Sequence, residues 1–370
     1  MKMMNYQVIA GIVLVFLLVA GFGAVRQATS PNRVIEKAEQ SIQSNHPAEL
    51  KNILVSRKGI VIGEKEAEGM IRYLRQHPKT WKTLKKDLRG QVDRSAYHSN
   101  NVLSLTKESG KPALFSRYKI YVRPQRIQVT GQESGDKVEL IADGRMIQPQ
   151  KKANHFQSVF PGSYPLQKKV VNDLGFFSKK QSLTVWNRPV TVSVHTLNWV
   201  QSDTATQKSI LTAVNQFNTE VAVWETTEYD PTVLQAATEN FSRNQSIQRN
   251  VQFKKVRAQL AEIKSAYLGM IVDQSSFACT HFGKWRATVD TVIRYQYGYR
   301  IKKSDKYYDA SYQRGVTYSL EYDRAERRWL VSGFNANGVT RAGAESWPHR
   351  KVIDNPQVQV QIWKPDGTSL

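Results

Sequence analysis

The chain has 370 residues, a net charge of +22 and one cysteine, Cys279. A single cysteine excludes an intrachain disulfide and any zinc site built from several cysteines, and the length suffices for two or three domains. The excess of positive charge favours a polyanionic partner, namely nucleic acid, anionic lipid or an anionic wall polymer, although a soluble, non-aggregating surface is the alternative.

Residues 8–25, VIAGIVLVFLLVAGFGAV, form an uncharged apolar run. Such a run is long enough to cross the hydrocarbon core of a membrane as a helix. A cleaved signal peptide is the alternative, but its apolar stretch is shorter, and Phe22 and Arg26 spoil the small-residue cleavage sites around Ala24. We therefore expect a short cytoplasmic tail (residues 1–7), a retained transmembrane helix and a body that carries about +21 of the charge. The flanking charges alone leave the side of the membrane open.

Residues 30–105 are predicted to form a mainly helical domain, because apolar residues recur there at three- and four-residue spacing. Ser30 followed by Pro31 is typical of a helix start, and the stretch EKEAEGMIRYL predicts a later helix. A further helix has an apolar stripe through Trp81 and Leu84 and a basic opposite face. That face is a candidate polyanion-binding surface, with a merely solvated helix face as the alternative. Its residues are Lys79, Lys82, Lys86 and Arg89.

Residues 106–200 change to an alternation of apolar and polar positions, interrupted by turn signals such as Asp143-Gly144 and Pro161-Gly162. We predict a small antiparallel β domain followed by a connector. The stretch FQSVFPGSYPL predicts two strands joined by a tight turn. This domain carries a second basic group of candidate polyanion-binding residues, Lys168, Lys169, Lys179 and Lys180.

Residues 203–370 begin with helices and continue with strands, which is an α+β pattern. An apolar stripe from Ile210 to Trp224 predicts the first helix, and a later helix is predicted to run from Phe253 to Tyr267. In the stretch DTVIRYQYGYRIKK, tyrosines alternate with polar and basic residues, so one strand face is rich in tyrosine. We expect this face to line or fill a cavity under the first helix. The candidate lining residues are Trp224, Tyr295, Tyr297 and Tyr299. The last basic candidates are Arg300, Lys302 and Lys303.

The order of these segments resembles the TcaA-like family of Gram-positive membrane proteins, named for a teicoplanin-resistance-associated member. The resemblance covers nearly the whole chain and rests on the apolar run, the EKEAEGMIRYL helix, the FPGSYPL stretch and a C-terminal part similar to NTF2 folds. It implies an α+β multidomain protein with one transmembrane helix, a helical domain like the TcaA second domain, a β domain and an NTF2-like domain.

The same resemblance implies a place and a role. Family members are cell-envelope proteins with the body outside the cell, linked to cell-wall metabolism and to glycopeptide antibiotic susceptibility. Typical members begin with a cytoplasmic zinc ribbon built on paired cysteine motifs, whereas only MKMMNYQ precedes the apolar run here. The sequence therefore gives no support for a sensing role of that ribbon.

The sequence has no GxSxG, HExxH, Walker or dinucleotide-binding motif. Its histidines are scattered, so we expect neither a metal nor a cofactor. Cys279 and His281 would share a strand face, but they lack an orienting acid, and a buried small hydrophobe is the alternative reading of the cysteine. Asp290 with Tyr295 or Tyr297 is a second enzymatic candidate, although on an ideal strand Asp290 faces away from both. We therefore expect no enzymatic activity.

Three functions compete. The leading hypothesis is a single-pass, extracytoplasmic protein that binds an anionic wall polymer, such as teichoic acid, or a peptidoglycan precursor, and so modulates wall assembly. Other envelope proteins are further expected partners. The alternative is a small-ligand receptor or enzyme using the C-terminal cavity, which inward polar groups would favour and a filling of tyrosine rings would disfavour. DNA binding fits the charge, but no nucleic-acid fold signature is present, so no nucleic-acid partner is expected.

Overall fold

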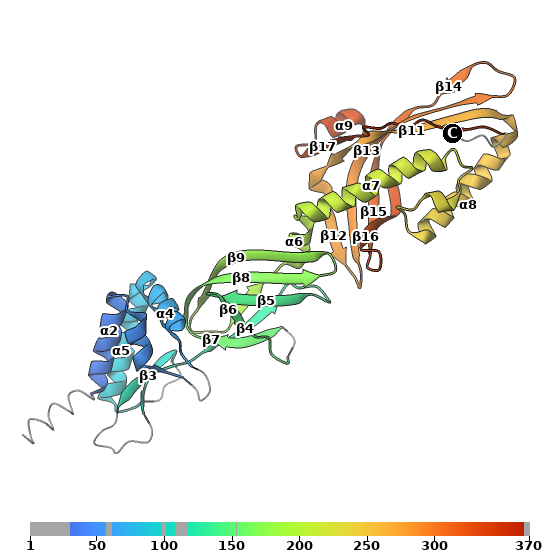
Figure 1. Ribbon diagram of the computed structural model, residues 1–370. Helices are drawn as coiled ribbons and strands as arrows, with labels where there is room; N and C mark the ends of the chain where they lie inside the picture. The colour runs from blue at the N-terminus through green and yellow to red at the C-terminus, as the bar shows by residue number, and fades with distance from the viewer. Residues whose placement is uncertain (1–29, 57–60, 98–100, 109–116, 153, 366–370) are drawn as a thin grey trace, which may run out of the picture. The chain divides into compact units, whose positions relative to one another are not determined.

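The computed structural model describes residues 30–56, 61–97, 101–108, 117–152 and 154–365. They form two compact units, each made of several stretches of chain (Figure 1). The first contains residues up to 131, 138–170 and 178–194, and the second contains residues 132–137, 171–177 and those from 195 onwards. The predicted anchor, residues 8–25, lies outside the described residues. Among the helices that the structure describes, none is long and apolar enough to cross a membrane.

The first unit begins with helices packed on a small sheet. Ser30 caps the first of them, since its Oγ accepts a hydrogen bond from the backbone N–H of Arg33, 3.4 Å away. Apolar side chains from all these elements share one core, which includes residues of the strands up to Val122 and also Phe160. The helices are α2 (Pro31–Gln43), α3 (Pro47–Ile53), α4 (Glu64–Gln76) and α5 (Pro78–Asp93). The sheet has the order β1-β3-β2, with β1 (Leu54–Val55), β2 (Leu103–Lys107) and β3 (Tyr118–Val122).

Two further sheets lie mainly in the first unit. One has the order β10-β4-β7, with β4 (Gln125–Thr130), β7 (His155–Val159) and β10 (Val190–Ser193). The other has the order β6-β5-β8-β9, with β5 (Lys137–Ala142), β6 (Arg145–Ile147), β8 (Gly162–Asn172) and β9 (Gly175–Val185). β10 runs parallel to β4, which departs from the predicted all-antiparallel arrangement. A parallel pair needs a long connection between its strands, and here β8 and β9 lie between β7 and β10 in the chain.

The two sequence stretches that carry the family resemblance touch each other. A Cβ atom on Gly69 of α4 would lie 2.2 Å from the ring of Tyr164, and one on Gly162 would lie 2.6 Å from the carbonyl carbon of Gly69. Only glycine at both positions lets the helix approach the start of β8 this closely. The hydroxyl of Tyr164 is held in place by donating to the carbonyl of Phe160 at 2.9 Å. EKEAEGMIRYL and FPGSYPL therefore form one packing contact within the first unit.

The second unit is a curved sheet with its two long helices on one face (Figure 1), while a short helix packs on the other face, where Ala344 clusters with Ile271 and Val292. Asp203 starts the longest helix, since its carboxylate accepts from the backbone N–H of Thr206 at 2.8 Å. The helices are α6 (Thr196–Gln201), α7 (Thr204–Trp224), α8 (Glu239–Val256) and α9 (Arg341–Glu345). The main strand order is β16-β15-β13-β11-β17, formed by β11 (Leu260–Asp273), β13 (Trp285–Ile301), β15 (Tyr312–Asp323), β16 (Arg328–Ala336) and β17 (Arg350–Asp354). Shorter strands join its edges and ends, namely β12 (Ala278–His281), β14 (Tyr307–Asp309) and β18 (Gln361–Trp363).

The register of β13 is the one that its alternation predicts. Ile293 and Tyr295 are buried, whereas Arg294 is half-buried and Lys302, just beyond the strand, is exposed. Because side chains on a strand alternate between faces, a shift by one residue would have reversed this pattern. The tyrosine face of β13 consequently lies against the helices.

The predicted helix from Phe253 to Tyr267 is wrong beyond its first turn. The helical part ends at Val256, and Leu260 already begins β11. Two irregularities in the pairing of β11 with β13, after Leu260 and after Tyr267, interrupt the simple alternation of this strand. Such bulges place buried residues three apart, which imitates helical spacing in the sequence.

Candidate functional site

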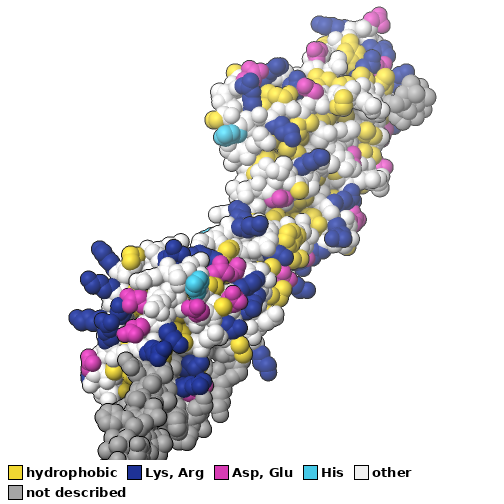
Figure 2. Space-filling view, turned by 60° about the vertical axis from the view of Figure 1, so that its left-hand side comes forward, with side chains coloured by type: hydrophobic (Ala, Val, Ile, Leu, Met, Phe, Trp, Pro, Cys, Tyr) yellow, Lys and Arg dark blue, Asp and Glu magenta, His cyan; other side chains and the backbone are white. Residues whose placement is uncertain are grey.

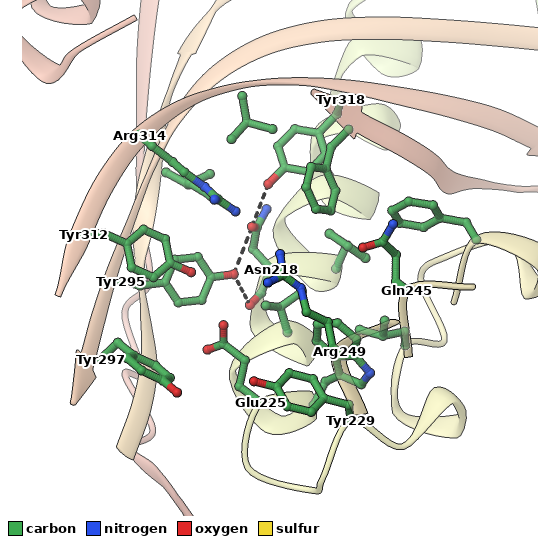
Figure 3. A pocket seen from close by; sticks show the side chains of 18 residues that line it. Asn218, Glu225, Tyr229, Gln245, Arg249, Tyr295, Tyr297, Tyr312, Arg314 and Tyr318 are labelled. Carbon is green, nitrogen blue, oxygen red and sulfur yellow. Dashed lines mark hydrogen bonds between the residues drawn. The ribbon is translucent and has the colours of Figure 1, made fainter. Parts of the chain in front are cut away.

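Helices α7 and α8 and the sheet of the second unit enclose a cavity of about 270 Å³ (Figure 3). It is the site that the alternating tyrosines of β13 indicated. Its wall combines apolar side chains, tyrosine rings and several polar and charged groups that point inwards. A concave site in which polar groups converge between apolar and aromatic side chains is typical of small-ligand sites.

One side of the cavity is fixed by a hydrogen-bonded network around Asn218 of α7. The Asn218 Oδ1 atom accepts from the hydroxyls of Tyr318 at 2.7 Å and Tyr295 at 3.0 Å, and its Nδ2 group donates to the carbonyl of Val214 at 2.8 Å. Burial raises the pKa of both tyrosines, so their hydroxyls stay protonated donors. These groups are already satisfied, and they position the wall without being available to a ligand.

Glu225 is the acidic group of the cavity and directly follows the last residue of α7. Its Oε2 atom accepts a hydrogen bond from the Oγ of the fully buried Ser265, 2.6 Å away on β11. Burial raises the pKa of this carboxyl to about 7, against the opposing effects of the Ser265 hydrogen bond and the charges of Arg249 and Arg314. Glu225 can therefore gain or lose a proton near neutral pH.

Two arginines approach the same space from opposite elements. Arg249 comes from α8 and Arg314 from β15, and Figure 3 shows both side chains turned towards the cavity. The guanidinium carbon of Arg314 lies 5.3 Å from the ring centroid of Tyr312, within cation–π range. Among the described residues, neither arginine has a carboxylate oxygen within the 4.0 Å of an ion pair. Both guanidinium groups thus keep donors for a ligand.

Three of the four predicted lining residues lie in the cavity wall, and one does not. Trp224, Tyr295 and Tyr297 line the cavity, whereas Tyr299 lies farther along β13 and stacks on Tyr308 at 5.4 Å between ring centroids. The indole Nε1 of Trp224 donates to the Oγ of Ser246 at 2.8 Å, which fixes the ring.

Sequence reasoning missed the charged residues of the cavity, Glu225, Arg249 and Arg314. A signal was present for Arg314, because it has the same strand parity as Tyr312, Val316 and Tyr318 and so had to share their inward face. Glu225 and Arg249 gave no such signal, since each is a polar residue on a helix or just after it. Such residues are normally solvated.

The predicted basic residues do not gather at one place. The α5 set of Lys79, Lys82, Lys86 and Arg89 is exposed. Figure 2 shows lysine and arginine side chains spread over the visible face of the molecule, with acidic ones among them. In the β part, Lys179 and Lys180 are exposed and Lys169 is half-buried. In the second unit, Arg300 lies 3.6 Å from Glu262, and Lys302 and Lys303 are exposed.

Lys168 is the exception among these candidates, because its exposed fraction is only 7%. Its Nζ donates to the carbonyl of Ser193 at 2.7 Å, and burial followed by the charge of Lys179 lowers its pKa. A lysine held in this way stabilises the first unit. Its prediction as a polyanion contact is therefore not supported by its position.

Neither candidate catalytic set gains support from the structure, although Nδ1 of His281 lies 3.9 Å from Oε2 of Glu133, an acid that the sequence did not indicate. Burial raises the pKa of Cys279 to about 11, which is opposite to the activation of a thiol nucleophile. Asp290 accepts a hydrogen bond from Thr317 and lies outside the cavity wall, away from Tyr295 and Tyr297. Among the residues that the structure describes, no group of three potential metal ligands converges.

Two protein-family models match the chain. Residues 31–122 match the second domain of TcaA protein, and residues 210–335 match the YvbJ NTF2-like domain. These two matches are those of a TcaA-like protein with a C-terminal NTF2-like domain. This confirms the resemblance seen in the sequence, including the NTF2-like nature of the C-terminal part. In this chain, the second-domain match covers α2 to β3, and the NTF2-like match contains all the residues that line the cavity. No curated protein matches the chain.

Proposed function

We propose that this TcaA-like protein is a non-enzymatic, membrane-anchored protein of the cell envelope, with its body outside the cell. In this proposal it binds an anionic wall polymer or a wall precursor and so modulates wall assembly or glycopeptide susceptibility. The family matches fit a cell-envelope protein. The observation that supports polymer binding is the α5 basic face, which we define as Lys79, Lys82, Lys86 and Arg89.

The geometry of the α5 basic face suits a polymer with repeated charges. The four residues recur at intervals of three and four, so they share one side of the helix over roughly 15 Å. The other side is buried through Trp81, Leu84 and Leu88, which keeps the cations turned outwards. None of the four forms an ion pair with a described residue. Exposed contacts of this kind are individually weak and are screened by salt.

The proposal is tested by the binding of purified teichoic acid to the full-length chain in a non-ionic detergent. We expect binding at low ionic strength. Binding should fall steeply as salt is added, because the Debye length shortens to about 8 Å at physiological salt and further at higher salt. The triple variant Lys82→Glu, Lys86→Glu and Arg89→Glu should bind much more weakly and keep its helical circular dichroism. Binding that is absent at low salt, or insensitive to salt, would refute the proposal.

A matched variant separates the α5 basic face from net charge. Lys254→Glu, Lys255→Glu and Lys351→Glu change the total charge equally at exposed sites in the second unit. We expect this variant to bind clearly better than the α5 variant. Equal losses would show that net charge alone attracts the polymer.

The second candidate function is a small-ligand receptor, and it is favoured by one specific observation. The cavity of the NTF2-like domain is open space with inward polar groups, and it is not filled by tyrosine rings. The two functions are compatible, because they use different units of the molecule.

A further inference from the structure

We propose that the cavity binds a small organic anion, whose carboxylate or phosphate group lies between Arg249 and Arg314, and that Glu225 takes up a proton when this anion binds. The inference rests on the second candidate function, the small-ligand receptor, and adds the chemical class of the ligand. It is independent of polymer binding by the α5 basic face.

The size of the cavity limits the ligand. A volume of about 270 Å³ lies just below the usual range of ligand pockets, about 300–1,000 Å³. A single ring with one acidic substituent fits such a space, whereas several units of a polymer do not.

The charges of the cavity favour an anion. Two guanidinium groups face one carboxyl group. The tyrosine hydroxyls are neutral near pH 7, and burial raises their pKa further, to about 12 for Tyr229. Arginine presents its N–H groups in a planar fork that matches carboxylate and phosphate oxygens. The rings of Tyr297 and Tyr312 provide flat apolar surface beside these donors (Figure 3). An aromatic or similarly flat acid satisfies both features.

Glu225 links this binding to protons. The groups that face it are Ser265 from β11, Arg249 from α8, Arg314 from β15, and the tyrosines Tyr229 and Tyr297. A second negative charge in this space repels the ionised carboxylate, whereas the protonated carboxyl is neutral and can donate a hydrogen bond. The anion therefore binds better when Glu225 is protonated, and affinity falls as the pH rises through about 7.

The test uses the purified full-length protein and isothermal titration calorimetry with four probes. Benzoate and phenyl phosphate carry the proposed groups, whereas benzyl alcohol and benzylamine are neutral and cationic analogues of similar size. We expect saturable binding of at least one anion and none of the two analogues. Benzoate stays ionised throughout, and its affinity should be up to about tenfold higher near pH 6 than near pH 8, as a single titrating group allows.

Variants assign the effect to residues. Arg249→Gln and Arg314→Gln should each weaken anion binding by about tenfold or more, as expected for loss of a charged hydrogen bond. Glu225→Gln should keep the binding and remove its pH dependence. Arg243→Gln is the control, because Arg243 lies on α8 outside the cavity and pairs with Glu239 at 2.6 Å.

The outcomes distinguish a failure of the anion assignment from a failure of the receptor function. If benzyl alcohol or benzylamine binds as well as benzoate, the anion assignment is overturned and the receptor remains. If the affinity for benzoate does not fall as the pH rises from 6 to 8, the proton uptake by Glu225 is overturned. If none of the probes binds up to millimolar concentration, both the anion assignment and the receptor are overturned. These results depend on the wild-type protein, so they hold even if an arginine variant fails to fold.

Discussion

At the scale of single residues, two polar groups of the same cavity have opposite roles. Asn218 is fully buried, and its amide makes hydrogen bonds to Tyr295, Tyr318 and Val214. Glu225 has one described side-chain donor, Ser265, and stays partly accessible from the cavity. A saturated network fixes a wall, whereas a carboxyl with spare acceptor capacity can respond to a ligand or to pH.

The raised pKa of Glu225 predicts how stability depends on pH. The unfolded carboxyl ionises near its ordinary value of 4.5 and the folded one near 7, so the folded state holds more protons between these values. Stability must then fall as the pH rises across this window, by on the order of 3 kcal/mol in total. Glu225→Gln should flatten this part of the urea-unfolding profile and be more stable than wild type near pH 8.

A second variant checks the cause of this effect. Ser265→Ala removes a hydrogen bond that favours the ionised carboxylate, so it should raise the pKa of Glu225 further and extend the loss of stability to higher pH. A Glu225→Gln profile parallel to that of wild type would show that this carboxyl is not the titrating group.

At the scale of elements, the long strand β11 depends on one glycine. Gly269 follows the second pairing irregularity and has a φ of +132°, which disfavours any side chain. A Cβ atom there would lie 2.4 Å from the carbonyl oxygen of Ile353 on β17. The bulge therefore lets β11 pair with β13 on one edge and with β17 on the other.

Gly269→Ala should destabilise the second unit by several kcal/mol, because it adds a backbone clash to the strain of the positive φ, itself about 1–3 kcal/mol. Gly175→Ala is the matched control, since Gly175 has a φ of +135° in the same unit but no atom within 4 Å of the added Cβ. Urea unfolding should show a clearly smaller loss for the control. Equal losses of stability would mean that β17 can shift away from the added methyl group without lowering the free energy of unfolding.

The elements also show what sequence patterns can predict. The stripe of α7 and the tyrosine alternation of β13 are regular, because each buries a continuous face against one partner, and both were predicted correctly. The strand β11 was missed because its bulges break the two-residue period that identifies strands. Glu225 and Arg249 were missed for a different reason, since their role depends on the cavity between elements. No local pattern contains that information.

At the scale of the whole molecule, the proposed orientation has a direct test. Residues 8–25 are predicted to stay attached as an anchor, with everything after them outside the cell. Protease added to intact protoplasts should then degrade the body of the chain, and a cytoplasmic marker should survive as the control. Full protection of the body, or release of a mature form that begins near Ala24, would contradict this topology.

The discontinuous make-up of the second unit has a consequence for the order in which the protein is completed. Asp136 and Asp173 belong to early segments of this unit, and their partners come later: Thr196 donates to Asp136 at 2.7 Å, and Arg324 pairs with Asp173 at 2.7 Å. Arg324 is synthesised about 150 residues after Asp173, which takes roughly 8–30 s at typical rates of translation. During that interval the early segments await their partners. A gene fragment that starts at residue 195 would therefore encode an incomplete C-terminal unit, although it contains the entire NTF2-like match.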